Sequence, residues 1–124
     1  MSIHESAEMY LETIYSLAQQ HATVRSIDVA EALGYSRPSI SRAVGLLKQD
    51  GYLLMDQDGS LVLTEKGTEV AQKIYERHTI LAAALVLLGV DKEIAATDAC
   101  KIEHDISDET FEAIKAHMKT YMPE

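Results

Sequence analysis

The stretch 26-SIDVAEALGYSRPSISRAVGLLKQDGYL-53 decides the fold, because its pattern predicts two short helices separated by a tight break. Ser26 can cap the first helix and Gly34 can end it. Ser36 can cap the second helix, and Pro38 falls in its first turn, where the missing N–H costs no hydrogen bond. The pair therefore predicts a helix-turn-helix. The positions expected to be buried are Ile27, Val29, Ala30, Leu33, Ile40, Val44, Leu46 and Leu47.

A further helix and a hairpin are expected on either side of this pair. Apolar residues recur at helical spacing from about residue 4 to residue 20. After the pair, 52-YLLMDQDGSLVLT-64 has two short apolar runs around Asp58-Gly59, which is a strong β-hairpin signal. Helix, helix, break, helix and hairpin in this order is the plan of a winged helix-turn-helix DNA-binding domain.

On this plan, the start of the second helix of the pair enters the major groove of DNA. Arginine there can contact phosphate or guanine, and serine can contact phosphate or either type of base. The predicted DNA-binding residues are Ser36, Arg37, Pro38, Ser39, Ser41 and Arg42. Taken singly, the serines could only start the helix and the arginines could be solvated surface. We favour DNA binding because the hairpin follows and this segment carries no competing chemistry.

The net charge of −9 would ordinarily argue against a nucleic-acid partner, so the charge has to be examined by segment. Residues 23–50 form a weakly basic island, whereas acids outnumber bases two to one from Glu76 onward. This division suits a protein that contacts DNA with one part and holds a cation with another. Asp56 and Asp58 in the hairpin would meet phosphates with like charge, so we expect modest wing contacts.

The composition indicates the cellular compartment in which we expect the protein. The single cysteine, Cys100, excludes an internal disulfide framework and fits a reducing cytoplasm. The longest apolar run, 80-ILAAALVLLGV-90, is too short to span a bilayer. We therefore expect a cytoplasmic protein without a membrane partner.

The C-terminal half is predicted to be helical throughout. A long helix is expected from about residue 65 to 88, although Gly67 in its first turn weakens that prediction. Further helices are expected over residues 92–105 and from Ser107 to about Tyr121. The predicted fold class is mainly α, with a winged helix-turn-helix domain over residues 1–73 and a helical metal-binding and dimerisation domain over residues 74–124.

The segment 98-DACKIEHDIS-107 carries three metal-ligating residue types. Cys100, Glu103 and His104 stand at positions i, i+3 and i+4 of a predicted helix, so their side chains can converge. A thiolate, a carboxylate and an imidazole suit a first-row divalent metal better than magnesium or calcium. Three ligands from one helix cannot enclose an ion. The candidates for further ligands are Met9, Glu12 and His78.

Each of these residues has an ordinary alternative role. Met9 could fill the core, Glu12 and His78 could be solvated, and Cys100 could be a small buried hydrophobe. One rival function is therefore a metal-independent winged-helix regulator whose C-terminal helices only dimerise. A small metalloenzyme is disfavoured because the sequence offers neither a recognisable general base nor a Gly-rich phosphate loop. We expect no enzymatic activity.

With these residues in hand, nearly the whole chain resembles the DtxR/MntR family of metal-dependent repressors. The motifs that carry the resemblance are 8-EMYLETIY-15, 29-VAEALGYSRPSISRAVGLLKQDGYL-53, 61-LVLTEKG-67, 77-RH-78 and 100-CKIEH-104. The resemblance implies a winged-helix domain, a helical dimerisation domain, and metal sites that link the first helix to the dimerisation domain. It also implies a homodimer that binds operator DNA when loaded with Fe(II) or Mn(II) and represses metal uptake.

The resemblance assigns two overlapping sets of ligands. Met9, Cys100, Glu103 and His104 match the primary site of the diphtheria toxin repressor type, whereas Glu12 and His78 match the manganese regulator type. Manganese-selective members have aspartate where Met9 stands and glutamate where Cys100 stands, so sulfur at both positions favours Fe(II), with Mn(II) as the alternative. Two ancillary ligands of the first type fall at Ala82 and Ala96, so one or two ions per subunit are expected. The short form, without an SH3-like domain, is also expected.

Overall fold

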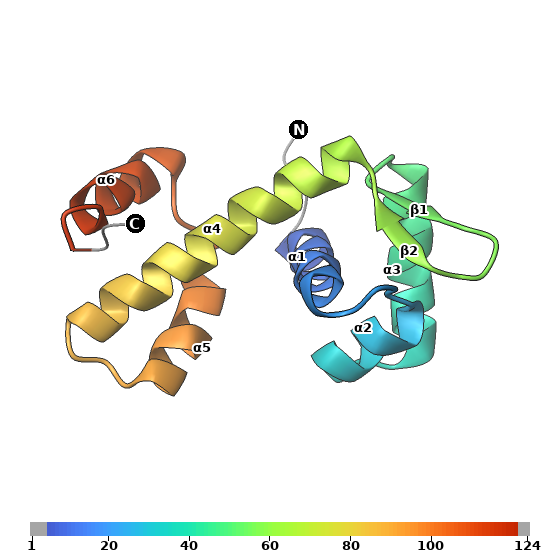
Figure 1. Cartoon of the computed structure of the whole chain (residues 1–124), viewed down its shortest axis with the longest axis horizontal. Helices are drawn as coiled ribbons and strands as arrows, with labels where there is room; N and C mark the ends of the chain where they lie inside the picture. Colours follow the sequence, from blue (N-terminus) through green and yellow to red (C-terminus); the bar gives the residue numbers. More distant parts are fainter. Residues whose placement is uncertain (1–4, 122–124) are drawn as a thin grey trace. The chain divides into compact units, whose positions relative to one another are not determined.

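The computed structural model describes residues 5–121 and is mainly helical, which confirms the predicted fold class (Figure 1). The chain divides into two compact units, Met1–Lys73 and Ile74–Glu124. The predicted helix start near residue 4 and the outer ends of the two predicted domains lie outside the described residues. None of the helices within residues 5–121 is long and apolar enough to cross a membrane.

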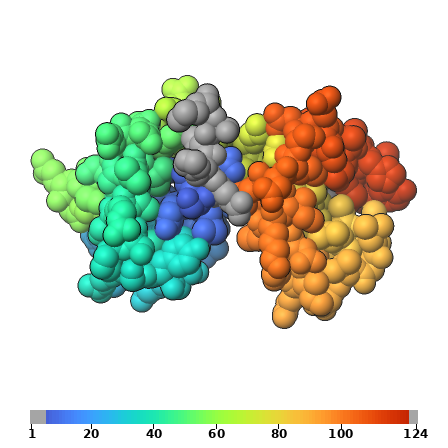
Figure 2. All heavy atoms as spheres, turned by 180° about the vertical axis from the view of Figure 1, so that it is seen from behind, coloured from blue at the N-terminus to red at the C-terminus, as the bar shows by residue number. Residues whose placement is uncertain are grey.

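Unit 1 is built from helices that precede a small hairpin and from the first turns of a long helix. Its elements are α1 (Glu5–Gln20), α2 (Ser26–Leu33), α3 (Arg37–Gln49), β1 (Leu53–Met55), β2 (Leu61–Leu63) and the start of α4 (Glu65–Leu87). The strands are antiparallel, with Leu53 opposite Leu63 and Met55 opposite Leu61. This order confirms the predicted winged helix-turn-helix. The turn between the strands projects from unit 1 as the wing (Figure 1 and Figure 2).

Local capping explains why α2 and α3 separate where they do. Gly34 follows α2 in the left-handed region, with φ at 72°, and its N–H donates to the carbonyl of Ala30 over 2.8 Å. Ser36 caps α3, because its hydroxyl accepts the N–H of Ser39 over 3.3 Å. The prediction that Ser26 caps α2 is wrong, since Arg25 occupies the N-cap position and Ser26 is the first helical residue.

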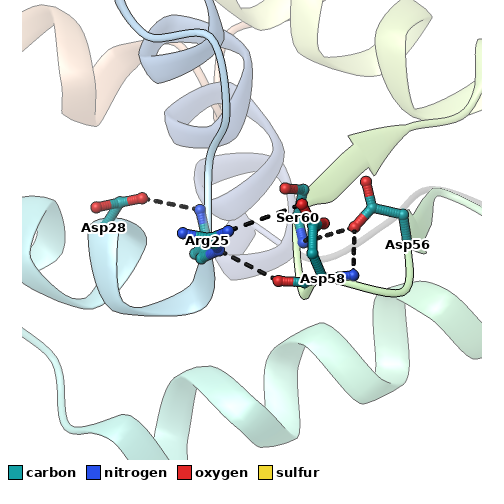
Figure 3. Close-up of polar contacts among 5 residues, drawn as sticks. All are labelled: Arg25, Asp28, Asp56, Asp58 and Ser60. Atoms are coloured by element: carbon teal, nitrogen blue, oxygen red, sulfur yellow. Dashed lines mark hydrogen bonds and ion pairs between the residues drawn. The ribbon is translucent and has the colours of Figure 1, made fainter.

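The wing is held to the start of α2 by Arg25 (Figure 3). Within the turn, the Asp56 carboxylate accepts the N–H groups of Asp58 and Ser60 over 3.2 and 2.9 Å. From the other side, the Arg25 Nε donates to the carbonyl of Asp58 over 3.3 Å, and a guanidinium nitrogen lies 3.8 Å from the Asp58 carboxylate. The Asp28 carboxylate accepts the N–H of Arg25 over 2.8 Å. Arg25 thereby joins the wing to α2.

The core of unit 1 combines side chains from every one of its helices and from the hairpin. The buried apolar residues are Leu11, Ile14, Val24, Val29, Ala30, Ile40, Val44, Leu47, Tyr52, Leu53, Leu61 and Ala71. The predictions that Ile27 and Leu46 are buried are wrong, since these side chains are 40% and 56% exposed. Each is two residues from a core position, Val29 or Val44, which is about 200° around a helix of 3.6 residues per turn.

Unit 2 contains the remainder of α4 together with α5 (Lys92–Ile102) and α6 (Asp108–Met118). Asp91 caps α5 by accepting the N–H groups of Glu93 and Ile94, and Ser107 caps α6 by accepting the N–H of Thr110. Leu81, Ala99 and Phe111 form the centre of a small core. This unit has few large buried residues, so polar contacts between its helices have a correspondingly larger share in holding it together.

The predicted C-terminal end of α5 is wrong. The helix ends at Ile102 and not at Asp105, so Glu103 is its C-cap residue and His104 lies in the turn that follows. Ile94 and Ile102 on this helix are 56% and 36% exposed. The small side chains of Ala95 and Ala99 are the ones that face the core.

Gly67 is required by a close approach within unit 1. A Cβ at this position would lie 2.0 Å from the Tyr52 carbonyl oxygen, which is far inside van der Waals contact. That carbonyl also accepts the N–H of Thr64, so it cannot move freely. We expect Gly67→Ala to lower the free energy of unfolding by about 1–3 kcal/mol, measured by urea denaturation.

Gly45→Ala is the matched control for this substitution. Gly45 lies inside α3, and a Cβ there meets no atom within 4 Å. Relief of glycine's backbone entropy should raise stability by about 0.5–1 kcal/mol. Equal effects of the two substitutions would show that helix propensity alone, and not the contact with Tyr52, determines the cost at Gly67.

Candidate metal centre and DNA-binding surface

Glu103 lies at the centre of the candidate metal site in unit 2. Its side chain is completely buried at the C-terminal end of α5. The Glu103 Oε1 lies 2.9 Å from Nδ1 of His78 on α4, and its Oε2 lies 3.4 Å from Nε2 of His104. Oε2 is buried and makes no hydrogen bond with any residue that the structure describes. A buried carboxylate oxygen in this position is open to a further cationic partner.

Cys100 joins the same cluster from the preceding turn of α5. The ligand atoms of His78, Cys100 and Glu103 all lie within 4.8 Å of one another. Cys100 is exposed, so the prediction of a possible small buried hydrophobe at this position is not met. The structure thus brings a thiol, a carboxylate and two imidazoles together within unit 2.

These donors fit a first-row divalent cation. Sulfur and imidazole nitrogen favour iron or zinc over magnesium and calcium, which prefer a shell of oxygens. The Oε2 of Glu103, which makes no hydrogen bond among the described residues, supplies an acceptor whose hydrogen-bonding capacity is unused. The ancillary positions Ala82 and Ala96 present only methyl groups and offer no ligand. Unit 2 therefore provides one group of donors centred on Glu103.

The protonation of His78 follows from this arrangement. Its pKa is raised from 6.5 to about 10, first by its hydrogen bond with Cys100 and then by its contact with the Glu103 carboxylate, while desolvation opposes the rise. In the metal-free protein, His78 is therefore an imidazolium near neutral pH. Its positive charge offsets the cost of burying Glu103.

Met9 and Glu12 lie on α1 in unit 1, and both are partly buried. They stand three residues apart, so their side chains emerge from the same face of the helix. The carbonyl of Met9 accepts the Thr13 hydroxyl over 2.8 Å, which is an ordinary contact within the helix. Met9 offers a thioether sulfur and Glu12 a carboxylate. This face of α1 therefore presents a sulfur donor and an oxygen donor, as Cys100 and Glu103 do.

The predicted DNA-binding residues occupy the first turns of α3, and they divide into two groups. The Ser36 and Ser39 hydroxyls bond to each other over 2.9 Å, and Ser36 also caps the helix, so both contribute to the local structure of the helix start. The other members, all exposed, are Arg37, Pro38, Ser41 and Arg42. Ser36 is exposed as well, whereas Ser39 is partly buried.

Sequence reasoning missed two arginines. Arg25 was counted only as part of the basic island, yet it anchors the wing. Arg77 was noted only within the motif 77-RH-78, yet its guanidinium is buried and bonded to the backbone of Glu103. No local pattern marks either role, because both depend on contacts with residues more than twenty positions away.

The raised pKa of His78 leads to a prediction for the metal-free protein. A group whose pKa is higher in the folded than in the unfolded state stabilises the fold below the unfolded pKa, and that stabilisation is lost as the pH rises through the folded pKa. We therefore expect the stability contributed by His78 to decline between pH 6.5 and about pH 10. Urea denaturation at a series of pH values would measure it.

His78→Gln is the control, because glutamine keeps a polar group but does not titrate. The difference in stability between the wild type and this variant should shrink across that pH range. A constant difference would contradict the proposed pairing of His78 with Glu103.

Comparison with known proteins supports both units. The family described as "Iron dependent repressor, N-terminal DNA binding domain" matches residues 2–61, and "Iron dependent repressor, metal binding and dimerisation domain" matches residues 64–122. The regulator MntR of Bacillus subtilis (strain 168) is 37% identical over 102 residues, which cover 82% of this chain and 72% of that protein. An uncharacterised HTH-type transcriptional regulator of Methanocaldococcus jannaschii is 33% identical over 119 residues, covering 94% of this chain and 95% of that protein.

Solved structures give the same result. A manganese-dependent transcriptional repressor in complex with manganese superposes with a TM-score of 0.82 at 29% identity, over 90% of this chain and 52% of that one. The manganese regulator SloR superposes with a TM-score of 0.81 at 26% identity, over 96% of this chain and 55% of that one. The chain thus spans about half the length of these solved structures. The resemblance noted in the sequence is confirmed: the chain belongs to the iron-dependent repressor family of metal-dependent transcriptional regulators, the DtxR/MntR family.

Proposed function

We propose that this member of the family represses metal-uptake genes and that His78, Cys100, Glu103 and His104 hold the metal ion it senses. The observation that carries this proposal is the buried carboxylate of Glu103, which has an imidazole near each oxygen and makes no hydrogen bond through Oε2 among the described residues. A bound divalent cation would supply the positive charge that this group of donors lacks when His78 gives up its proton. The relatives named as manganese regulators support a divalent metal as the effector.

We further propose that Met9 and Glu12 contribute ligands from α1. This assignment rests on the donor chemistry of the two side chains and on their match to the family pattern. Because α1 belongs to unit 1, metal binding would be coupled to the unit that contains α3. Coupling of this kind requires that the DNA-binding arrangement of the chain binds metal more tightly than the metal-free ensemble does.

The identity of the metal is a separate proposal. Sulfur in both Met9 and Cys100 favours Fe(II), since thioether and thiolate are softer donors than the carboxylates of manganese-selective members. The relatives named MntR point toward Mn(II). We propose Fe(II) as the preferred ion and Mn(II) as an ion that also activates. Titration of the protein with each metal would give the number of ions bound per subunit.

We propose that unit 2 dimerises through an exposed apolar hollow of about 450 Å³ between α4, α5 and α6. Leu87 and Leu88 at its rim are 53% and 79% exposed, and Ile102 is 36% exposed. Apolar side chains that cluster in this way on a small unit usually mark an interaction surface. The family description of this part of the chain as a dimerisation domain supports a second copy as the occupant.

The metal response of DNA binding tests the main proposal. An operator fragment, selected from random duplexes with the metal-loaded protein, would be titrated by fluorescence anisotropy with and without Fe(II) or Mn(II) under anaerobic conditions. Metal should tighten binding by about tenfold or more, within the usual range of allosteric coupling. Half-activation should occur at a lower concentration of Fe(II) than of Mn(II).

Glu103→Gln provides the decisive variant, because it keeps the size of the side chain and removes its charge. This variant should lose the metal response, whereas Glu109→Gln, a change of the same kind at an exposed residue of α6, should retain it. Equal DNA affinity of the wild type with and without metal would refute the proposed function. It would favour the metal-independent regulator.

The salt dependence of binding tests the DNA-binding surface. If Arg42 neutralises a phosphate, Arg42→Ala should lower the slope of log K against log salt by about 1 and weaken binding to all sequences alike. Arg25→Ala is the comparison, since Arg25 is engaged with the wing. If Arg42→Ala left both slope and affinity unchanged, the placement of α3 against DNA would be wrong.

A further inference from the structure

We propose that Arg77 is a positioning residue of the metal centre, which fixes the turn that carries Glu103 and His104 and ties that turn to α6. This inference rests on the proposed function, because it concerns the same metal ligands. Arg77 itself cannot be a ligand, since its guanidinium is always protonated and has no lone pair to offer. Its role would be exerted entirely through the residues that it holds.

The contacts of Arg77 converge on the connection between α5 and α6. The side chain is buried, with 6% of its surface exposed. Its Nη1 donates to the carbonyl oxygens of Glu103 and Ile106 over 3.0 and 2.8 Å. Its Nη2 donates to the carboxylate of Asp108, and the guanidinium carbon lies 5.4 Å from the centre of the Phe111 ring. One side chain thus contacts both ends of the turn.

These contacts give hydrogen-bond partners to carbonyl groups at the end of α5. The last carbonyls of α5 have no partner within the helix, and a cation close to a helix C-terminus is favourable. The planar fork of arginine can bond to carbonyls and a carboxylate at once, which the single ammonium of lysine does less well. The Nε of Arg77 makes no hydrogen bond among the described residues, so the guanidinium is held by its two terminal nitrogens.

Glu103 is held at both ends by consecutive residues of α4. Arg77 bonds to its backbone carbonyl, and His78 contacts its carboxylate over 2.9 Å. The contact with Arg77 fixes the position of the Glu103 backbone, and the contact with the His78 imidazole fixes the position of its carboxylate. Mutation of partners that orient ligands in this way typically weakens metal binding by about 10–100-fold. The position of Glu103 therefore depends on Arg77 before any metal binds.

Arg77 also links the ligands to α6. Asp108 is the first residue of α6, and Phe111, in the next turn, is buried in the core of unit 2. A displacement of the Glu103 backbone would consequently also displace the start of α6. The family description places metal binding and dimerisation in this same part of the chain, so the linkage joins the two roles.

Co(II) titration of the full-length protein tests the inference, because the visible spectrum of Co(II) reports the number and geometry of its ligands. Arg77→Lys keeps the positive charge but replaces the fork. It should weaken Co(II) binding by about tenfold or more, in the range seen for residues that orient ligands, and should change the visible spectrum. Leu81→Val is the control for packing, since Leu81 belongs to the same core and lies outside the contacts described for Arg77. It should lower thermal stability and leave the Co(II) affinity and spectrum unchanged.

A second pair of variants decides the matter if Arg77→Lys does not fold. Asp108 and Glu109 are both acids in the first turn of α6, but only Asp108 bonds to Arg77. Asp108→Ala should weaken Co(II) binding by about tenfold, whereas Glu109→Ala should not. Folded Arg77→Lys with the wild-type affinity and spectrum overturns the inference. If that variant is unfolded, identical behaviour of the two alanine variants overturns it.

Failure of the proposed function would give a different result. If Glu103→Gln bound Co(II) as the wild type does, the proposed ligands would be wrong and Arg77 would have no metal centre to position. If Glu103→Gln lost Co(II) binding while Arg77→Lys retained it, the ligands would stand and only the role of Arg77 would be refuted.

Discussion

The buried carboxylate of Glu103 is the constraint on which unit 2 depends. Removing a carboxylate from water is costly unless cations or hydrogen-bond donors surround it. His78 and His104 lie against its oxygens, and Arg77 holds the carbonyl of the same residue. These contacts join α4 to the end of α5 in a unit whose apolar core is small. The same residue therefore connects these two helices and provides the centre of the proposed metal site.

In unit 1, the charged side chains of Arg25 and Asp58, which pair with each other, are exposed, unlike the buried Glu103 of unit 2. Arg25 belongs to the basic island but is engaged by the wing, where it faces the carboxylate and the carbonyl of Asp58 (Figure 3). This pairing reduces the negative charge that the wing would bring toward phosphates. The ion pair is exposed, so its own effect on stability is small, and its value lies in fixing the turn. The arginines at the start of α3 are exposed, and we propose that they contact DNA in this DNA-binding domain.

Much of the fold could be predicted because its signals are local. Gly34, Ser36 and the Asp58-Gly59 turn each specify a boundary through their own backbone chemistry, and the structure confirms these boundaries. The errors occurred where distant contacts decide. Leu46 follows the apolar pattern but points to solvent. Gly67, a weakness by helix propensity alone, is demanded by the Tyr52 carbonyl.

The sequence by itself determined the winged helix-turn-helix, the helical second unit and the donor types at Cys100, Glu103 and His104, because spacing and residue chemistry carry this information. Only the tertiary structure decided that α5 ends before Glu103, that this carboxylate is buried against His78, and that Arg77 holds its backbone. The physical reason is distance along the chain. Residues 77 and 78 lie some 25 positions from residue 103, and only the packing of α4 against α5 brings their charges together.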